Sequence, residues 1–450
     1  MKSISELDWR GKGGVAPDLV LSRAGVLDPR AEIDGIFDVV LRGGEVAELA
    51  EPGSVGESEA ELVEAEGMRV FPAFFDPHVH LRTPGQEDAE DVETGSRAAA
   101  AGGYCGILAM ANTSPPVDSA GDISALRELA SAEASVPVGF LATVTREMAG
   151  EELSEMAELA EAGAAGFSDD GLPIRSARVL RRALQYQRMV GGQIALHEED
   201  PELSGGGVMH EGPVSAMLGL EGIPSVSEST MIARDTALAR FEDARIHVQH
   251  LSARESVEVV TAAKGEGITI SCEATPHHLT LTDADVRALD ARFKMNPPLR
   301  SEDDRQALIE GLRSGAIDCV ATDHAPHPPE SKEVPFEQAA MGVTGLETAF
   351  AVLHTELVLP GALELGTLVE RMSAGAAAFD LAPPSLVKGS EANLVLFDPE
   401  AEWEAGADGW ESRSSNSCFG GRRLMGRVLM TVAAGGVAYR QRSFAMGVAE

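Results

Sequence analysis

The stretch FFDPHVHLRTPG, residues 74–85, begins as an apolar run and then places His78, His80 and Arg82 at alternate positions. Side chains of a β-strand alternate between its two faces, so the two histidines share a face, and Arg82 joins them if the strand continues. Two imidazoles spaced in this way can chelate one metal ion. A single histidine at a strand end is more often structural, however, and H-x-H alone is a weak motif. The stretch predicts a strand end and leaves open whether it carries metal ligands.

Further short apolar runs follow, and helix-like stretches separate them. The helical pattern is clearest at residues 123–134, 176–190 and 255–267, where apolar positions recur at helical spacing. Alternation of strand and helix over about 250 residues is typical of an α/β fold, the (β/α)8 or TIM barrel. The predicted strands are 73–80, 106–112, 138–144, 164–169, 192–197, 244–250, 268–274 and 317–323.

The two ends of the chain follow another pattern. Residues 18–50 alternate apolar and polar side chains between Gly, Asp and Pro breaks, and residues 391–403 and 426–440 form a second β-rich block. We therefore expect a small β-sandwich domain built from both chain ends, 18–70 and 385–450. The barrel is expected at 71–384 and an N-terminal extension at 1–17.

Composition excludes several classes of protein. The formal charge of −36 would repel nucleic acid and anionic lipid. The longest uncharged, mostly apolar run, residues 98–111, is shorter than the roughly 18 residues of a membrane span, and the first residues lack the apolar core of a signal peptide. Four widely spaced cysteines without a C-x-x-C pair argue against disulfides or a cysteine zinc site. A cytoplasmic enzyme without a nucleic-acid or membrane partner is expected.

The active site of such a barrel lies at the carboxyl ends of its strands. Potential metal ligands stand at five of the eight predicted strand ends, and they are His78, His80, Asp169 or Asp170, His197, His250 and Asp323. Imidazole and carboxylate without thiolate suit zinc or a similar divalent ion in a catalytic site. Four histidines and two carboxylates exceed the needs of one ion, so we expect two ions that share a carboxylate. Water between them would be acidified toward hydroxide at neutral pH.

Taken together, these motifs resemble those of the amidohydrolase superfamily and, within it, the bacterial dihydroorotases. The resemblance spans most of the chain in family order. Its motifs are DPHVHLRTPGQE (76–87), ETGSRAAAAGGY (93–104), MANTSPPVDS (110–119), GFSDDG (166–171), ALHEED (195–200), HVQHLSARES (247–256), TPHHLTLT (275–282), KMNPPLRSEDDR (294–305) and DCVATDHAPH (318–327).

The resemblance implies a ligand for each metal position. His78 and His80 would bind the first ion with Asp323, and His197 and His250 would bind the second. Asp170 rather than Asp169 would bridge the ions, because the second aspartate of D-D-G is the ligand in this family. Two divalent ions are expected, with Zn²⁺ the expected metal. Many hydantoinases and allantoinases use a carboxylated lysine as the bridge, and AAGFSDDG contains no lysine.

The resemblance also implies the substrate and the reaction. N-carbamoyl-L-aspartate would close reversibly to dihydroorotate and water in pyrimidine biosynthesis, with Asp323 as general acid and base. Arg82, Asn112 and His327 match the family positions that hold the substrate carboxylate. Asn296 matches a further substrate contact, and Met341 and Gly342 match a segment whose backbone contacts the pyrimidine ring. Ala111, where the family usually has proline, precedes Asn112, and SSNSCFGG near the C-terminus departs from the usual N-T-P-F.

Two other functions stay open at this point. One is another cyclic amidase, an allantoinase or hydantoinase, which would use the same metals on a different ring. The other is an inactive scaffold for aspartate transcarbamoylase, although such relatives lose metal ligands and this chain retains all of them. A homodimer is expected, and an active enzyme could also associate with the transcarbamoylase.

Overall fold

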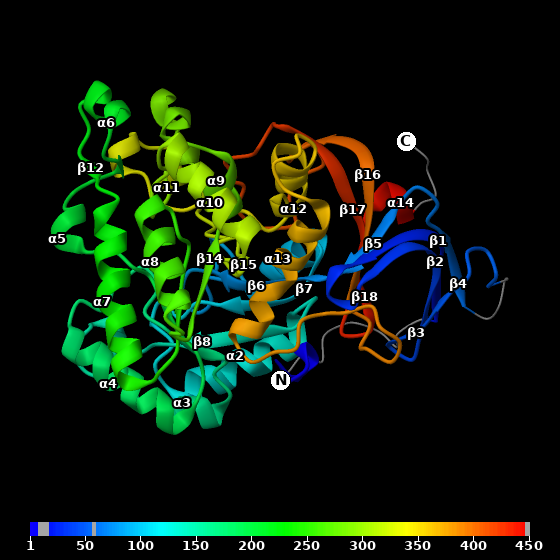
Figure 1. Cartoon of the computed structure of the whole chain (residues 1–450), viewed down its shortest axis with the longest axis horizontal. Coiled ribbons are helices and arrows are strands. Elements are labelled where there is room, and N and C mark those ends of the chain that lie inside the picture. The colour runs from blue at the N-terminus through cyan, green and yellow to red at the C-terminus, as the bar shows by residue number, and fades with distance from the viewer. Residues whose placement is uncertain (8–17, 56–59, 446–450) are drawn as a thin grey trace.

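The computed structural model describes residues 1–7, 18–55 and 60–445, and within these ranges the centre of the chain is a parallel barrel (Figure 1). Its strands lie in the order β15-β14-β13-β10-β9-β8-β7-β6. Every predicted barrel strand is present, somewhat shorter than expected. The strands are β6 (Phe74–Val79), β7 (Tyr104–Ala109), β8 (Val138–Ala142), β9 (Gly166–Ser168), β10 (Ile194–Leu196), β13 (Ile246–Val248), β14 (Ile270–Ala274) and β15 (Cys319–Val320).

The barrel closes between its first and last strands. Val79 pairs in parallel with His324, just beyond β15, and the amide of His80 donates to the carbonyl of His324 at 2.8 Å. Below this point Asp76 accepts hydrogen bonds from the amide and hydroxyl of Thr322. Asp76 shares a face with His78 in the sequence pattern, and in the structure it joins the two closing strands.

A helix follows each barrel strand and covers it from outside (Figure 1). Several of these helices begin at capping side chains: Asp91 and Thr94 form a capping box at the first, and Ser176 and Ser301 cap two others. The outer helices are α1 (Val92–Ala101), α2 (Ala120–Glu133), α3 (Met156–Ala162), α4 (Ala177–Val190), α7 (Val226–Glu242), α8 (Arg254–Gly265), α10 (Glu302–Ser314) and α13 (Leu365–Ala378).

Shorter elements lie in the loops and near the C-terminus. They are α5 (Pro201–Ser204), α6 (Pro213–Leu218), α9 (Pro276–Thr280), α11 (Pro329–Lys332), α12 (Ala349–Leu353), α14 (Arg442–Ala445), β11 (Met209–His210) and β12 (Gly222–Ile223).

The small β domain combines both chain ends, as predicted. In Figure 1 the blue first strands and the orange to red last strands lie together at one end of the molecule. They form one mixed sheet in the order β18-β17-β16-β5-β1-β2-β3, and β4 also pairs with β1. The strands are β1 (Leu19–Asp28), β2 (Ile33–Arg42), β3 (Glu45–Ala50), β4 (Glu61–Glu64), β5 (Arg69–Pro72), β16 (Leu394–Glu404), β17 (Arg423–Ala433) and β18 (Gly436–Arg440).

The two units share apolar packing. Phe71 of β5 and Phe397 of β16 belong to the barrel core, where their rings lie 5.8 Å apart and Phe350 contacts both. The described start of the chain also packs against the barrel, because Ile4 is buried in the same core. The rest of the predicted N-terminal extension, residues 8–17, lies outside the described residues.

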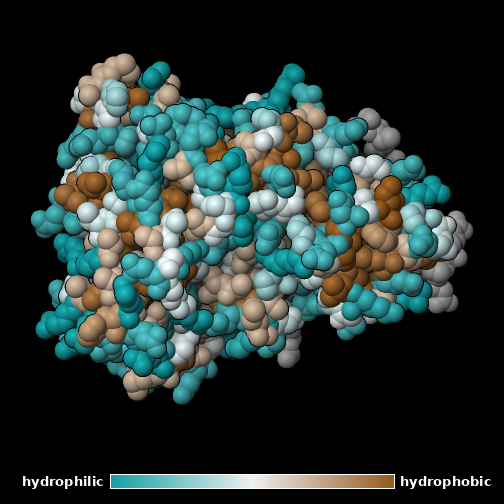
Figure 2. Space-filling view, in the orientation of Figure 1, coloured by the Kyte–Doolittle hydropathy of each residue, from teal (hydrophilic) through white to brown (hydrophobic). Residues whose placement is uncertain are grey.

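The surface agrees with the composition. Figure 2 shows hydrophilic residues over much of one face, with an apolar area at the small sheet. All four cysteines are buried free thiols, as predicted. Among the described residues, no helix is both long enough and apolar enough to cross a membrane.

Candidate functional site

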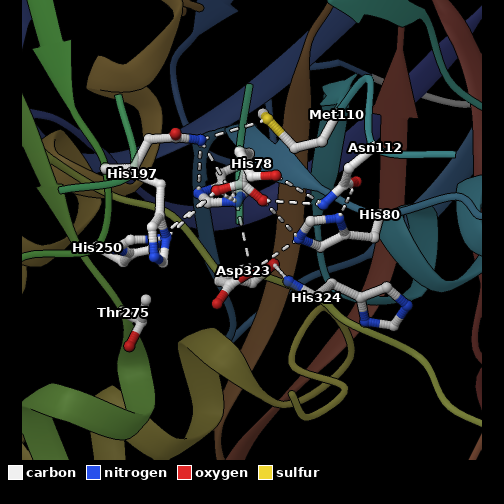
Figure 3. Close-up of polar contacts among 12 residues, drawn as sticks. His78, His80, Met110, Asn112, His197, His250, Thr275, Asp323 and His324 are labelled. Atoms are coloured by element: carbon white, nitrogen blue, oxygen red, sulfur yellow. Dashed lines mark hydrogen bonds and ion pairs between the residues drawn. The ribbon is translucent and has the colours of Figure 1, made fainter. Parts of the chain in front are cut away.

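The six predicted metal ligands converge at the carboxyl ends of the barrel strands. His78 lies near the end of β6 and His80 just beyond it, while the other four follow β9, β10, β13 and β15. All six are almost fully buried. Figure 3 shows His78, His80, His197, His250 and Asp323 gathered around one point, with the ring of His324 turned away from them.

Asp170 and Asp323 contact the first pair of histidines. His80 Nε2 lies 3.0 Å from Asp323 Oδ1 and 3.5 Å from Asp170 Oδ2. His78 Nε2 lies 3.4 Å from Asp323 Oδ1 and 3.5 Å from Asp170 Oδ1. Four side chains from three strand ends therefore surround one small space.

The second pair of histidines also lies close to Asp170. His197 Nδ1 and His250 Nε2 lie 2.9 Å apart, and they are 3.8 Å and 3.7 Å from Asp170 Oδ1. Two nitrogen ligands of one tetrahedral zinc ion are themselves about 3.4 Å apart, given bonds of about 2.1 Å. The observed separations bracket this value, so the spacing of these side chains is consistent with metal binding.

The electrostatics of the site also favour bound cations. Burial alone would lower the pKa of His78, but the charges of Asp170 and Asp323 raise it well above its usual value. Burial alone would raise the pKa of Asp170, but His78 brings it well below its usual value. Asp170 Oδ1 is buried and makes no hydrogen bond within the described part of the chain. The buried carboxylates thus stabilise positive charge, and the histidine and aspartate clusters are consistent with metal binding.

The structure separates the two aspartates of the D-D-G motif. Asp169 turns away from the histidines and accepts hydrogen bonds from the amides of Val144 and Thr145 and from the Thr145 hydroxyl. Burial raises the pKa of Asp169 to about 6. Of the two aspartates, Asp170 is therefore the one that lies among the four histidines.

Three of the predicted site residues adopt left-handed backbone conformations. The φ angles are 60° at Arg82, 32° at His250 and 48° at Asp323. Residues other than glycine rarely adopt such angles, and each costs on the order of 1–3 kcal/mol. The surrounding packing imposes this strain where the chain leaves a barrel strand, and it directs these side chains into the site.

Four of the predicted substrate residues lie next to one another, and they are Arg82, His327, Met341 and Gly342. Arg82 Nε donates to the carbonyl of Pro326 at 3.1 Å, and Arg82 Nη2 lies 3.4 Å from His327 Nε2. His327 Nε2 donates to the carbonyl of Met341 at 2.8 Å. At Gly342, with φ 127°, a β-carbon would lie 2.7 Å from Ala325 Cβ, so a side chain would be excluded there.

The two predicted asparagines lie at the histidine cluster, Asn112 in direct contact with it and Asn296 through Glu199. Asn112 Oδ1 accepts from His80 Nδ1 at 2.9 Å, and Asn112 Nδ2 donates to Asp170 Oδ2 at 3.2 Å. The Ala111 position does not prevent this arrangement. Asn296 Nδ2 donates to Glu199 Oε2 at 2.5 Å. All predicted substrate residues therefore surround the same group of histidines.

Several functional neighbours were absent from the sequence prediction. Glu273 Oε1 lies 2.6 Å from His78 Nδ1 and Oε2 lies 2.9 Å from His247 Nε2, so this carboxylate orients the ring of His78 from beneath the site. Asn416 donates to the carbonyls of Ala325 and Gly342. Asn416 belongs to SSNSCFGG, the segment that departs from the family pattern. That departure was the one feature of the sequence that could have drawn attention to Asn416.

The sequence prediction also missed Lys332, which holds the segment that carries His327, Met341 and Gly342 in place. Its buried ammonium donates to three carbonyls, at 2.9 Å to Ala291, 3.1 Å to Lys294 and 2.8 Å to Ala340. The amide of Gly342 donates to the carbonyl of Lys294 as well. Lys332 thereby joins this segment to the one that leads into Asn296.

Replacing Lys332 with Met should lower the free energy of unfolding by about 2–3 kcal/mol at pH 9, because buried carbonyls lose their donor. Burial lowers the pKa of Lys332 to about 7, so at pH 9 its amine is neutral, still donates hydrogen bonds and adds no cost of burying a charge. Urea unfolding measures the effect. The control is Lys294→Met, in which one carbonyl contact, to Glu337, is lost. Equal losses in the two variants would contradict this account.

Comparison with known proteins identifies the family. The family model for dihydro-orotase-like proteins matches residues 67–256. Dihydroorotase from Solibacter usitatus (strain Ellin6076) is 43% identical over 426 residues, which cover 94% of this chain and 99% of that protein. The chain belongs to the dihydroorotase family. Dihydroorotase from Anaeromyxobacter dehalogenans (strain 2CP-C) is 44% identical over 426 residues, or 92% of this chain and 96% of its own length. The predicted dihydroorotase family is confirmed.

Solved structures confirm the predicted fold class of this dihydroorotase-family chain. L-hydantoinase (dihydropyrimidinase) from Arthrobacter aurescens has a TM-score of 0.83 at 26% identity, covering 94% of this chain and 96% of that chain. Dihydropyrimidinase from Brevibacillus agri NCHU1002 has a TM-score of 0.80 at 22% identity, covering 94% and 95%. The second likeness shows a shared fold alone.

Proposed function

We propose that the chain catalyses the reversible cyclisation of N-carbamoyl-L-aspartate to dihydroorotate, with Asp323 as general acid and base. The main support is the 43% identity to a dihydroorotase over 99% of that relative. The site supports it as well, because a guanidinium, that of Arg82, lies at the edge of the carboxylate and imidazole cluster. The substrate and product both carry carboxylates that such a cation would bind.

Asp323 is suited to carry the proton of this reaction. Its contacts to His80 and His78 both use Oδ1, so Oδ2 is the oxygen available to a proton. Burial alone would raise the pKa of Asp323, but the charges of these histidines lower it, so the carboxylate starts ionised. It would take up a proton from the attacking water and give it to the amide nitrogen as the ring opens, and both transfers would run in reverse as the ring closes.

The other residues bind and orient. Arg82 and His327 would hold the substrate carboxylate, with Met341 and Gly342 presenting backbone along the ring and Asn112 beside the metal cluster. Gly342 is buried and the other four are partly buried, so each of these four side chains keeps some surface that can face the substrate. We propose that His78, His80 and Asp323 hold one Zn²⁺, that His197 and His250 hold a second, and that Asp170 bridges them. Bound divalent ions would polarise the amide carbonyl and acidify water.

Replacing Arg82 with Met should raise KM for dihydroorotate by about 100-fold and change kcat much less. Two charge-assisted hydrogen bonds to the substrate are lost, together worth about 3 kcal/mol. Steady-state kinetics in both directions measure the split, with the exposed Arg313→Met on α10 as control. An unchanged KM, or a loss confined to kcat, would show that Arg82 does not bind the carboxylate.

The remaining alternative is another cyclic amidase, because the protein of similar structure at 26% identity is a hydantoinase. Asp170 occupies the place where many hydantoinases would need a lysine, and this favours dihydroorotase. Assays on dihydroorotate, allantoin and a hydantoin, combined with elemental analysis, distinguish the two. Turnover of a hydantoin without turnover of dihydroorotate would refute the proposal. The homodimer, the cytoplasmic location and the association with aspartate transcarbamoylase stay predictions.

A further inference from the structure

Glu199 connects a metal ligand to a substrate residue. It follows His197 by two positions, just beyond β10. One of its oxygens, Oε2, accepts from Asn296 Nδ2 at 2.5 Å and lies 3.4 Å from His197 Nε2. The same oxygen thus serves both neighbours, although Glu199 and Asn296 are 97 residues apart in the chain.

The contact with His197 determines how this ring is protonated. A carboxylate oxygen can only accept, so Glu199 requires a proton on His197 Nε2. The lone pair of Nδ1 then faces His250 Nε2, at 2.9 Å, and Asp170 (Figure 3). A carboxylate on the outer nitrogen of a histidine is a common support for a metal ligand.

The contact with Asn296 determines how its amide is turned. Because the Glu199 oxygen only accepts, the NH₂ group of Asn296 must face it, and the carbonyl oxygen must point elsewhere. That oxygen, Oδ1, is buried and has no hydrogen-bond partner within the described residues. A buried acceptor left without a donor destabilises the free enzyme, and a substrate N–H would remove this cost on binding.

We propose that Glu199 is a positioning residue that fixes the Asn296 amide so that its oxygen accepts a ring N–H of the substrate. The inference rests on the proposed function, in which Asn296 contacts dihydroorotate. Both dihydroorotate and N-carbamoyl-L-aspartate carry N–H groups. Without Glu199 the amide could turn its NH₂ group toward them, and donor would then face donor.

Kinetics of Glu199→Met and Glu199→Gln test this role. Met keeps the length and removes the acceptor, so KM for dihydroorotate should rise about tenfold or more while kcat stays within about threefold. Gln retains an acceptor at the same place and should bring KM back to within about threefold of the parent value. Excess zinc in every assay keeps metal loss from imitating the effect, and Glu202→Met, an exposed glutamate on α5, is the control.

An exchange variant keeps the test independent of whether Glu199→Met folds. Asn296→Asp alone places two carboxylates in contact and should raise KM at least tenfold. Adding Glu199→Gln supplies an NH₂ group to Asp at 296 and should restore most of the affinity. An unchanged KM in Glu199→Met, no rescue by Gln, or no rescue in the exchange variant would each overturn the proposal. A parent chain without dihydroorotate turnover would instead refute the proposed function.

Discussion

The Asp323→Asn variant should fold like the parent chain and lose dihydroorotate turnover in both directions by about 10³-fold. Asparagine has the shape of aspartate, and its Oδ1 can take the place of the aspartate oxygen that lies 3.0 Å from His80 Nε2 in the parent. It cannot take up and release a proton at neutral pH. The loss should appear in kcat, because Arg82 and His327 still bind the substrate.

Stopped-flow or steady-state assays, elemental analysis and thermal unfolding together separate proton transfer from ligation. The matched control is Asp318→Asn on the same chain segment, one residue before β15. Asp318 pairs with Lys264 at 2.6 Å, away from the histidine cluster, so this variant should keep its kcat and lose some stability. Near-normal turnover in Asp323→Asn would refute the acid and base role. Loss of activity only in step with loss of metal would assign Asp323 to ligation alone.

The barrel was predictable because its signal is local. Each strand is a short apolar run buried on both faces, and runs of this kind are visible without knowing their partners. The predicted ends were too long by up to three residues, as with 317–323 against Cys319–Val320. The sequence pattern still resembles a strand beyond Val320, the last residue of β15 that pairs with a neighbouring strand. Asp323 lies in this extension. Site residues therefore follow the strands rather than ending them.

The contacts around the ligands were not predictable in the same way. Glu199 meets Asn296 across 97 residues, and Asn416 meets Ala325 across 91. Such pairs depend on where loops from different strands come together. Neither the spacing of hydrophobic residues nor the type of each residue predicts which loops will meet. Lys332 gave no signal either, because its partners are backbone carbonyls. The residues that hold the site in shape were thus harder to find than those that act in it.

The chain resembles both a hydantoinase, at 26% identity, and a dihydroorotase, at 43% identity, and one physical explanation accounts for both similarities. The barrel and its strand-end histidines provide a site for opening cyclic amides, whichever ring is bound. We propose that the choice of ring depends on the groups around the histidine cluster. Here those groups include Arg82, fastened to Pro326, and the His327–Gly342 segment, fastened by Lys332.

The Asp170→Asn variant should lose both metal content and activity, because Asp170 lies near both pairs of histidines. Its Oδ1 lies 3.5 Å from His78 Nε2 and 3.7 Å from His250 Nε2. An amide has no charge to offset two divalent ions and binds them weakly. Elemental analysis should find one ion or none per chain where the parent holds two, and turnover should fall by about 10²-fold or more.

The neighbouring Asp169→Asn is the matched control for this experiment. Asp169 accepts from the amides of Val144 and Thr145 and lies outside the histidine cluster. This variant should lose about 1–2 kcal/mol of stability and keep its metal content. If the two variants lost metal equally, the bridging role would belong to the loop as a whole. If Asp170→Asn retained two ions and normal turnover, another residue would have to join the two halves of the site.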